Sequence, residues 1–230
     1  DHQKNISGKI MSIDGSCFKF HPTKENEWLR YSLDSVFYNE GEYANTNSNN
    51  THWMDISKSL RLDLKPWRTQ GNHILICLQR DIGWNAKGFD QQDWLNKTVK
   101  MIRKQTGRPI HIRPHPSNKL DWSTITTAYS DVKLTDSVTR PLQADISGAH
   151  AGVFFNSSSS VAAVLEGVPV YVSDPGAVTW KVANHTTRDI ENPVMPDREQ
   201  WLYDLCQCHW TIEQARNGDI YRHFNPYLPS

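Results

Sequence analysis

The sequence lacks the features that define several large classes of protein. Its four cysteines are too few and too scattered for a disulfide scaffold, so we expect reduced, structural thiols and a cytoplasmic protein. Acidic and basic side chains balance at 25 each, which leaves no overall field to attract nucleic acid or an anionic membrane. No apolar run has the length of a membrane span, and no signal-peptide pattern opens the chain. Because the first residue is not Met, we expect a piece of a longer protein.

A persuasive metal site is also missing from the sequence. The motif Asp-x-Asp does not occur, and His and Cys do not cluster with the spacing of zinc ligands. Cys206 and Cys208 lie two apart on a predicted helix, so their side chains leave it in different directions. Asp90 and Asp93 are explained as the cap and first turn of another helix. We therefore expect neither a metal ion nor another cofactor.

The stretch from His150 to Ser173 organises the rest of the chain. It reads as an apolar strand at 151–155, a polar turn, a short helix from Val161, and a second apolar strand at 168–172. A right-handed crossover of this kind places both strands in one parallel sheet. Four consecutive serines then lie between a strand and a helix, where an anion such as phosphate is expected. The alternative is a serine-rich surface turn with ordinary helix capping.

Strands and helices alternate from His73 onward, which predicts an α/β fold with a Rossmann-like parallel sheet and helices on both faces. The predicted strands are residues 73–79, 109–113, 132–134, 151–155 and 168–172, and the predicted helices are residues 90–105, 122–129, 142–146 and 161–165. The flanking segments are less regular: we expect a hairpin of residues 9–13 and 17–20, a strand at 60–64, and only helices after residue 192. This divides the chain into a partial N-terminal subdomain with a linker (1–70), a Rossmann-like domain (71–192) and C-terminal helices that pack back on the fold (193–230).

Polar clusters follow the predicted strands, at the sheet edge where open parallel sheets bind ligands. Arginine, histidine and hydroxyl donors are suited to a phosphate or diphosphate. The chain also has nine tryptophans, which fill cores but also make stacking surfaces for bases and sugars. The candidate ligand-binding residues are Arg80, Arg113, His115, Asn156, Ser157, Ser158, Ser159, Ser160 and Asp174.

Each candidate also has a purely structural interpretation. Arg80 has Asp81 beside it as an ion-pair partner, and Arg113 lies where it can satisfy a neighbouring carboxylate. His115 stands between two prolines and can serve as a rigid turn residue. Asp174 begins an Asp-Pro-Gly sequence, which is first of all a turn signal.

Two motifs carry a resemblance to a known family. Arg113-Pro114-His115-Pro116, followed by the serines at 157–160, resembles the paired His-Pro and Ser-Ser motifs of bacterial sialyltransferases and capsule Kdo transferases. Those enzymes are GT-B glycosyltransferases, built from two Rossmann-like domains that face each other across a cleft. Trp67-Arg68, Gln79-Arg80-Asp81 and the stretch 190–201 are similar to glycosyltransferase-like proteins of tailed phages. The resemblance covers about residues 65–210.

The resemblance implies that residues 71–192 are the donor-binding half of a GT-B enzyme that needs no metal. His115 would be the catalytic residue at the donor phosphate, and the other candidates would bind phosphate or nucleotide. The donor would be a UDP- or CMP-linked sugar, used as a co-substrate. The acceptor would be a surface glycan or, if the protein is phage-encoded and works in the host cytoplasm, hydroxymethylated pyrimidine in DNA. One departure is Glu166: many GT-B enzymes have a ribose-binding Glu earlier in this helix, near the place of Ala162.

Two other functions fit the same sequence features. A nucleotide-sugar epimerase or hydrolase shares the fold and the phosphate site, but it needs acid and base side chains within that site. A non-catalytic nucleotide-binding module needs only the phosphate site. Product analysis with the donor alone separates the epimerase from the transferase.

Overall fold

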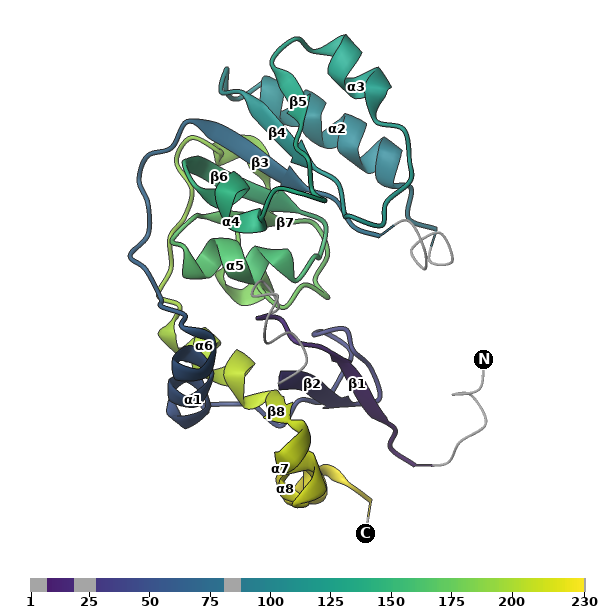
Figure 1. Cartoon of the computed structure of the whole chain (residues 1–230), viewed down its shortest axis with the longest axis vertical. Coiled ribbons are helices and arrows are strands. Elements are labelled where there is room, and N and C mark those ends of the chain that lie inside the picture. Colours follow the sequence, from purple (N-terminus) through teal and green to yellow (C-terminus); the bar gives the residue numbers. More distant parts are fainter. Residues whose placement is uncertain (1–7, 19–27, 81–87, 230) are drawn as a thin grey trace. The chain divides into compact units, whose positions relative to one another are not determined.

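The structure is a computed structural model that describes residues 8–18, 28–80 and 88–229 (Figure 1). Contacts within the chain divide it into two units. Residues 63–196 form the central unit, and the two end segments, 1–62 and 197–230, together form the terminal unit. The first and last segments, which the sequence analysis treats separately, are thus parts of one unit.

A five-stranded parallel sheet forms the middle of the central unit, with strand order β5-β4-β3-β6-β7. Every residue of β3, β6 and β7 is buried, as expected for strands that are covered on both faces. The predicted α/β fold with a Rossmann-like parallel sheet is confirmed. The strands are β3 His73–Cys77, β4 Ile110–Arg113, β5 Val132–Leu134, β6 Ala149–Phe154 and β7 Val170–Val172.

Helices cover both faces of this sheet. In Figure 1, α2 and α3 lie on one side of it, and α4 and α5 lie on the other. The helix α2 begins where predicted, because the Asp90 carboxylate accepts hydrogen bonds from the Gln92 and Asp93 amides. The helices are α2 Gln91–Arg103, α3 Ser123–Ala128, α4 Leu142–Ile146 and α5 Ser159–Leu165, with 3₁₀ turns η4 Trp180–Val182 and η5 Thr187–Asp189.

The segment that leads into the central unit runs along the end of α5. The Lys65 and Arg68 amides donate to the carbonyls of Leu165 and Gly167. Gly167 has a positive φ of 78°, and a Cβ there would lie 2.0 Å from the Pro66 carbonyl oxygen. Only glycine therefore fits where this segment crosses the helix end. The Trp67 indole donates to the Pro196 carbonyl over 2.8 Å, which holds the two ends of the central unit together.

The terminal unit differs from the sequence-based expectations. Its sheet is antiparallel, with order β1-β2-β8, and pairs strands from both ends of the chain. Tyr31, Leu33, Trp210, Ile220 and Phe224 form a buried cluster among the described residues of this unit. Its elements are β1 Met11–Gly15, β2 Trp28–Leu33, α1 Thr51–Leu60, α6 Glu199–Gln207, β8 His209–Thr211, α7 Ile212–Arg216, α8 Asp219–Phe224 and η6 Asn225–Tyr227.

Three local predictions are wrong in this region. The hairpin of 9–13 with 17–20 does not form, because β1 pairs with β2; Cys17 and Phe18 lie in a buried turn, and residues 19 and 20 are outside the described residues. The strand at 60–64 is absent, because α1 continues to Leu60 and Arg61 ends it in the left-handed conformation. Residues after 192 are not all helical, because His209–Thr211 completes the sheet beside β2.

No helix of the described residues combines the length and the apolar character needed to cross a membrane. Within the same residues, no group of three or more His, Cys, Asp or Glu side chains is placed to hold a metal ion.

Candidate functional site

The predicted site residues follow the carboxyl ends of neighbouring strands, at the same edge of the sheet and at matching positions in the strand register. Cys77 of β3 is paired in register with Arg113 of β4 and Phe154 of β6, and Phe154 is paired with Val172 of β7. All four strands run in the same direction, so their carboxyl ends share one edge of the sheet. Gln79, His115, Asn156 and Asp174 each lie two residues beyond one of these paired residues.

His115 and Arg80 lie side by side at this edge. The Arg80 Nε atom is 3.4 Å from the His115 Nε2 atom. The Ser117 amide donates to the His115 Nδ1 atom over 3.1 Å, and the Ser117 hydroxyl lies 2.8 Å from the same nitrogen. The Arg80 Nε–H donates to His115 Nε2 and the Ser117 amide donates to Nδ1, so a donor approaches each ring nitrogen. The cationic Arg80 guanidinium therefore lies against the His115 ring at this edge, and its positive charge favours an anionic guest. Asp81, the alternative partner of Arg80, lies outside the described residues.

Gln79 connects the two halves of the edge. Its side-chain Nε2 donates to the Asn156 Oδ1 atom over 2.5 Å, beyond the end of β6. Its carbonyl accepts from the Asn118 side chain over 2.9 Å, three residues after His115. The Gln79 amide donates to the Gln91 Oε1 atom over 2.8 Å. Gln79 is only 8% exposed, and among the described residues its Oε1 atom has no hydrogen-bond partner. These contacts fix the loops after β4 and β6 to the end of β3.

The four serines have different surroundings. The hydroxyls of Ser157 and Ser159 are 2.8 Å apart, and both residues are partly exposed, while Ser158 is exposed. Ser160 is fully buried: its hydroxyl donates to the Ser157 carbonyl and accepts from Thr179. Ser157, Ser158 and Ser159 are therefore available to a ligand, whereas Ser160 closes the turn from inside. We call residues 157–160 the serine turn.

Arg113 has the structural partner considered as the alternative. Its guanidinium contacts the Asp145 carboxylate and donates to the Arg140 carbonyl over 2.8 Å. Asp145 is 1% exposed and also accepts hydrogen bonds from Arg140 and Thr135. Burial alone would raise the pKa of Asp145, but these hydrogen bonds from Arg113, Arg140 and Thr135 lower it below the ordinary value. Arg113 thus anchors α4 to the end of β4.

Asp174 and Glu166 also have structural partners. The Asp174 carboxylate accepts a hydrogen bond from the Gly176 amide over 2.6 Å, as the turn interpretation predicts. Glu166 forms an ion pair with Lys65 over 2.6 Å. It lies at the C-terminal end of α5, so it is remote from the edge that carries the serine turn. Glu166 therefore does not take the role of a ribose-binding carboxylate.

The sequence analysis missed three polar residues of the edge as site residues. Ser117 orients His115, while Asn118 and Gln91 hold Gln79. Gln91 is buried although it stands at the start of a helix, where a glutamine is usually exposed. Short polar loops have no hydrophobic periodicity from which a role could be predicted. The only sequence signal for Ser117 and Asn118 is that they stand two and three residues after His115.

Comparison with known proteins shows similarity in the fold. No protein-family model matches the sequence, and no significant match was found among curated proteins. Among solved structures, the β-Kdo 2,7 transferase of KpsC from Thermosulfurimonas dismutans has a TM-score of 0.57 and 13% identity, and the match covers 92% of this chain and 77% of that one. The β-Kdo 2,4 transferase of the same KpsC has a TM-score of 0.55 and 13% identity, covering 82% and 68%. The resemblance to Kdo transferases is thus supported at the level of the fold, and the similarity to phage proteins stays a prediction.

Proposed function

We propose that this protein is a glycosyltransferase that takes its sugar from a nucleotide-linked donor. The donor phosphate binds at the carboxyl edge of the central sheet, between His115 with Arg80 on one side and the serine turn on the other. In this proposal the acceptor is a hydroxyl group of a glycan, as suggested by the two structural neighbours, which are named as transferases of the sugar Kdo.

One observation carries the proposal: four strand ends bring their polar residues to the same level of one edge. His115 follows β4 and the serine turn follows β6, with β3 between them. Two strand spacings are about 10 Å, so a ligand that reaches both sides must be larger than a single phosphate. A nucleotide joined to a sugar meets this requirement.

The chemistry follows from the donors at the edge. When the bond between the sugar and the phosphate oxygen breaks, negative charge grows on the departing phosphate. The Arg80 guanidinium offsets this charge, and His115 beside it acts as the general acid that gives a proton to the leaving oxygen. The hydroxyls of Ser157 and Ser159 add neutral donors on the other side. In this scheme these protein side chains neutralise the phosphate charge, a role that a divalent cation has in other transferases.

The test is a thermal-shift titration of the whole chain with CMP-, UDP- and GDP-linked sugars. We expect one nucleotide class to raise the melting temperature of the wild type, and His115→Ala to weaken that effect at least tenfold in ligand concentration. His185→Ala is the matched control, because it removes an exposed imidazole that stacks on Trp180 instead of lying beside Arg80. If none of the three classes stabilises the wild type, the donor site is rejected.

A further inference from the structure

Three aromatic side chains gather at the same edge of the sheet, each from a different element. Phe89 precedes α2, Trp94 lies in its first turns, and Phe155 directly follows β6. The rings of Phe89 and Phe155 stack with centroids 3.9 Å apart and an interplanar angle of 30°. The Trp94 ring meets Phe155 edge-on at 6.0 Å and 82°. We call these three residues the aromatic cluster.

Hydrogen bonds hold the cluster at the exits of β6 and β7. The Trp94 indole Nε1 donates to the Ser173 hydroxyl over 3.1 Å. The Phe155 carbonyl accepts from the amides of Ser173 and Asp174 over 3.0 Å and 3.1 Å. These bonds fix Trp94 and Phe155 to the residues that follow β7. The rings therefore form a surface that is already ordered before any ligand binds, which lowers the entropy cost of binding.

The exposure of the cluster distinguishes it from ordinary core packing. Phe154, one residue earlier, is completely buried, and its ring lies against Gly152 on the other face of the strand. Phe89, Trp94 and Phe155 each keep part of their surface exposed. Partly exposed rings from three elements, brought together at a sheet edge, offer a flat apolar surface beside polar groups.

The position of the cluster indicates what it binds. Phe155 immediately precedes Asn156, whose side chain accepts the hydrogen bond from Gln79, and the serine turn follows at once. A ligand that places its phosphate at the serine turn therefore has its next chemical group beside Phe155. In a nucleotide that group is the nucleoside, and every base has a flat face that stacks on aromatic side chains.

We infer that the aromatic cluster is the base-binding part of the donor site, on which a nucleobase stacks. This inference rests on the proposed function, because the serine turn must hold the phosphate of the same molecule. Stacking tolerates different bases, so the cluster supplies affinity for the nucleoside, and the phosphate contacts set its position.

The experiment is isothermal titration of the whole chain with three probes: CMP, UMP and ribose 5-phosphate. Ribose 5-phosphate has the sugar and phosphate of the nucleotides but no base. We expect the wild type to bind at least one nucleotide more tightly than ribose 5-phosphate. Phe155→Leu and Phe89→Leu should each weaken nucleotide binding about 5- to 150-fold and leave ribose 5-phosphate unchanged. Phe155→Tyr keeps the ring and should bind like the wild type.

Tyr129→Leu is the matched control. Tyr129 is a partly buried aromatic residue that packs on the same hydrophobic core, and it lies at the end of α3, at the opposite edge of the sheet. Its nucleotide binding should equal that of the wild type. Equal affinity of the wild type for nucleotides and ribose 5-phosphate would overturn the inference and leave the phosphate site intact. The same conclusion follows if the two Leu variants lose ribose 5-phosphate as strongly as nucleotide. Failure of all three probes with the wild type, together with no stabilisation by any of the CMP-, UDP- and GDP-linked sugars, would reject the donor site itself and the base-binding surface with it.

Discussion

The hydroxyl of Ser117 lies 2.8 Å from the Nδ1 atom of His115, and the Ser117 amide donates to the same nitrogen over 3.1 Å. Both contacts come from a residue only two positions further along, after Pro116 has turned the chain. The imidazole is thereby held with its Nε2 atom toward Arg80, whose Nε–H donates to it over 3.4 Å. Ser117 is a positioning residue in the proposed transferase, because its contact to the donor passes through His115.

Ser117→Ala removes the hydroxyl contact and leaves the amide contact in place. Loss of one hydrogen bond of this kind corresponds to about a 2- to 12-fold effect, so we expect kcat for sugar transfer to fall within that range. KM for the donor should change less than kcat, because the variant mainly disturbs proton delivery. Steady-state kinetics with the donor identified by the thermal-shift screen measures both. Ser117→Thr retains the hydroxyl and should restore the rate; an alanine variant with unchanged kcat would remove Ser117 from this role.

The buried Asp145 carboxylate should support the central unit in a pH-dependent manner. Its hydrogen bonds with Arg113, Arg140 and Thr135 hold its folded-state pKa below the ordinary value, so it contributes stability above the unfolded pKa of about 3.9. That contribution is lost as the pH falls through the folded-state pKa. Asp145→Asn leaves two arginines without their carboxylate and should lower the free energy of unfolding by about 3–5 kcal/mol at pH 7.

Urea unfolding at pH 7 and near pH 3 checks the effect of Asp145→Asn, with a smaller difference from the wild type expected at the lower pH. Asp93→Asn is the control, because Asp93 pairs with Lys97 on an exposed helix face and should barely change the unfolding midpoint. A deficit that is equal at both pH values would contradict the electrostatic explanation.

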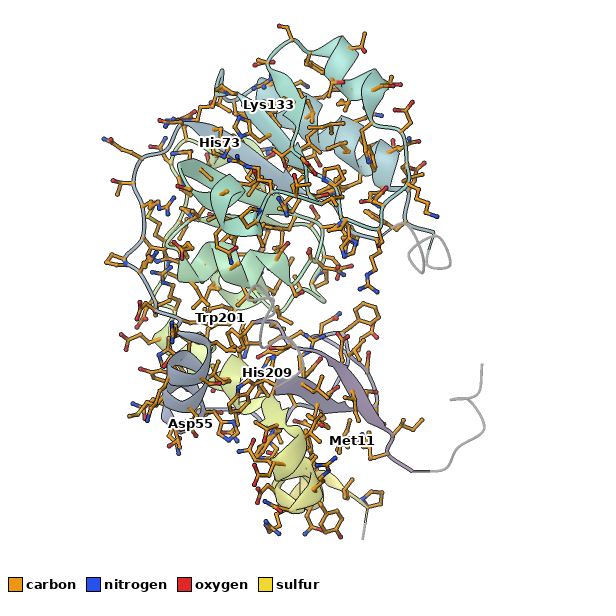
Figure 2. The ribbon with its side chains drawn as sticks, in the orientation of Figure 1. Met11, Asp55, His73, Lys133, Trp201 and His209 are labelled. Carbon is orange, nitrogen blue, oxygen red and sulfur yellow. The ribbon has the colours of Figure 1, made fainter. Side chains whose placement is uncertain are left out.

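Two stacked imidazoles near the start of the central sheet should destabilise it in mild acid. The ring centroids of His73 and His111 are 3.9 Å apart. His73 and Lys133 are labelled in Figure 2. Burial, His73 and Lys133 lower the pKa of His111 to about 4. The unfolded chain takes up this proton near pH 6.5 and the folded chain near pH 4, so stability is complete above pH 6.5 and declines as the pH falls between these values.

His111→Val should flatten the decline in stability between pH 6.5 and pH 4, as followed by urea midpoints at half-unit steps of pH. His185→Gln provides the comparison, since it removes an exposed imidazole and should keep the decline. An unaltered pH profile in His111→Val would assign the acid sensitivity to other groups.

Gly167→Ala should destabilise the junction where the entering segment crosses α5. A non-glycine residue at a φ of 78° costs about 1–2 kcal/mol, and contact of the new Cβ with the Pro66 carbonyl adds to that cost. Thermal unfolding should show a clear decrease in melting temperature. Gly107→Ala is the matched variant, because a Cβ at Gly107 has no heavy atom within 4 Å, and it should melt like the wild type.

Much of the central unit could be predicted from its sequence. Short apolar runs, such as the one at β6, bounded by turn residues, are sufficient to place buried parallel strands, and the direction of those strands brings the residues after them to one edge. The hydrogen-bond and ion-pair partners of each candidate site residue could not be predicted in this way. Arg113 and Asp145 are 32 positions apart, and nothing local indicates that one satisfies the other.

The terminal unit was less predictable because its sheet depends on distant pairing. Leu29 of β2 lies opposite Trp210 of β8, and the two residues come from opposite ends of the chain. His209–Thr211 is short and stands between two helices, so local propensity gives it no strand signal. The same reason explains the wrong hairpin: β1 has its partner in β2, beyond the turn that Cys17 and Phe18 occupy.

The hydrogen bond between Trp67 and Pro196 means that the central unit begins and ends at the same point. A unit whose two ends lie close together tolerates insertion into a surface loop of another protein, and it also tolerates circular permutation, because neither change has to stretch the backbone. We therefore expect that the sheet and its carboxyl edge can be moved into another protein as one inserted segment.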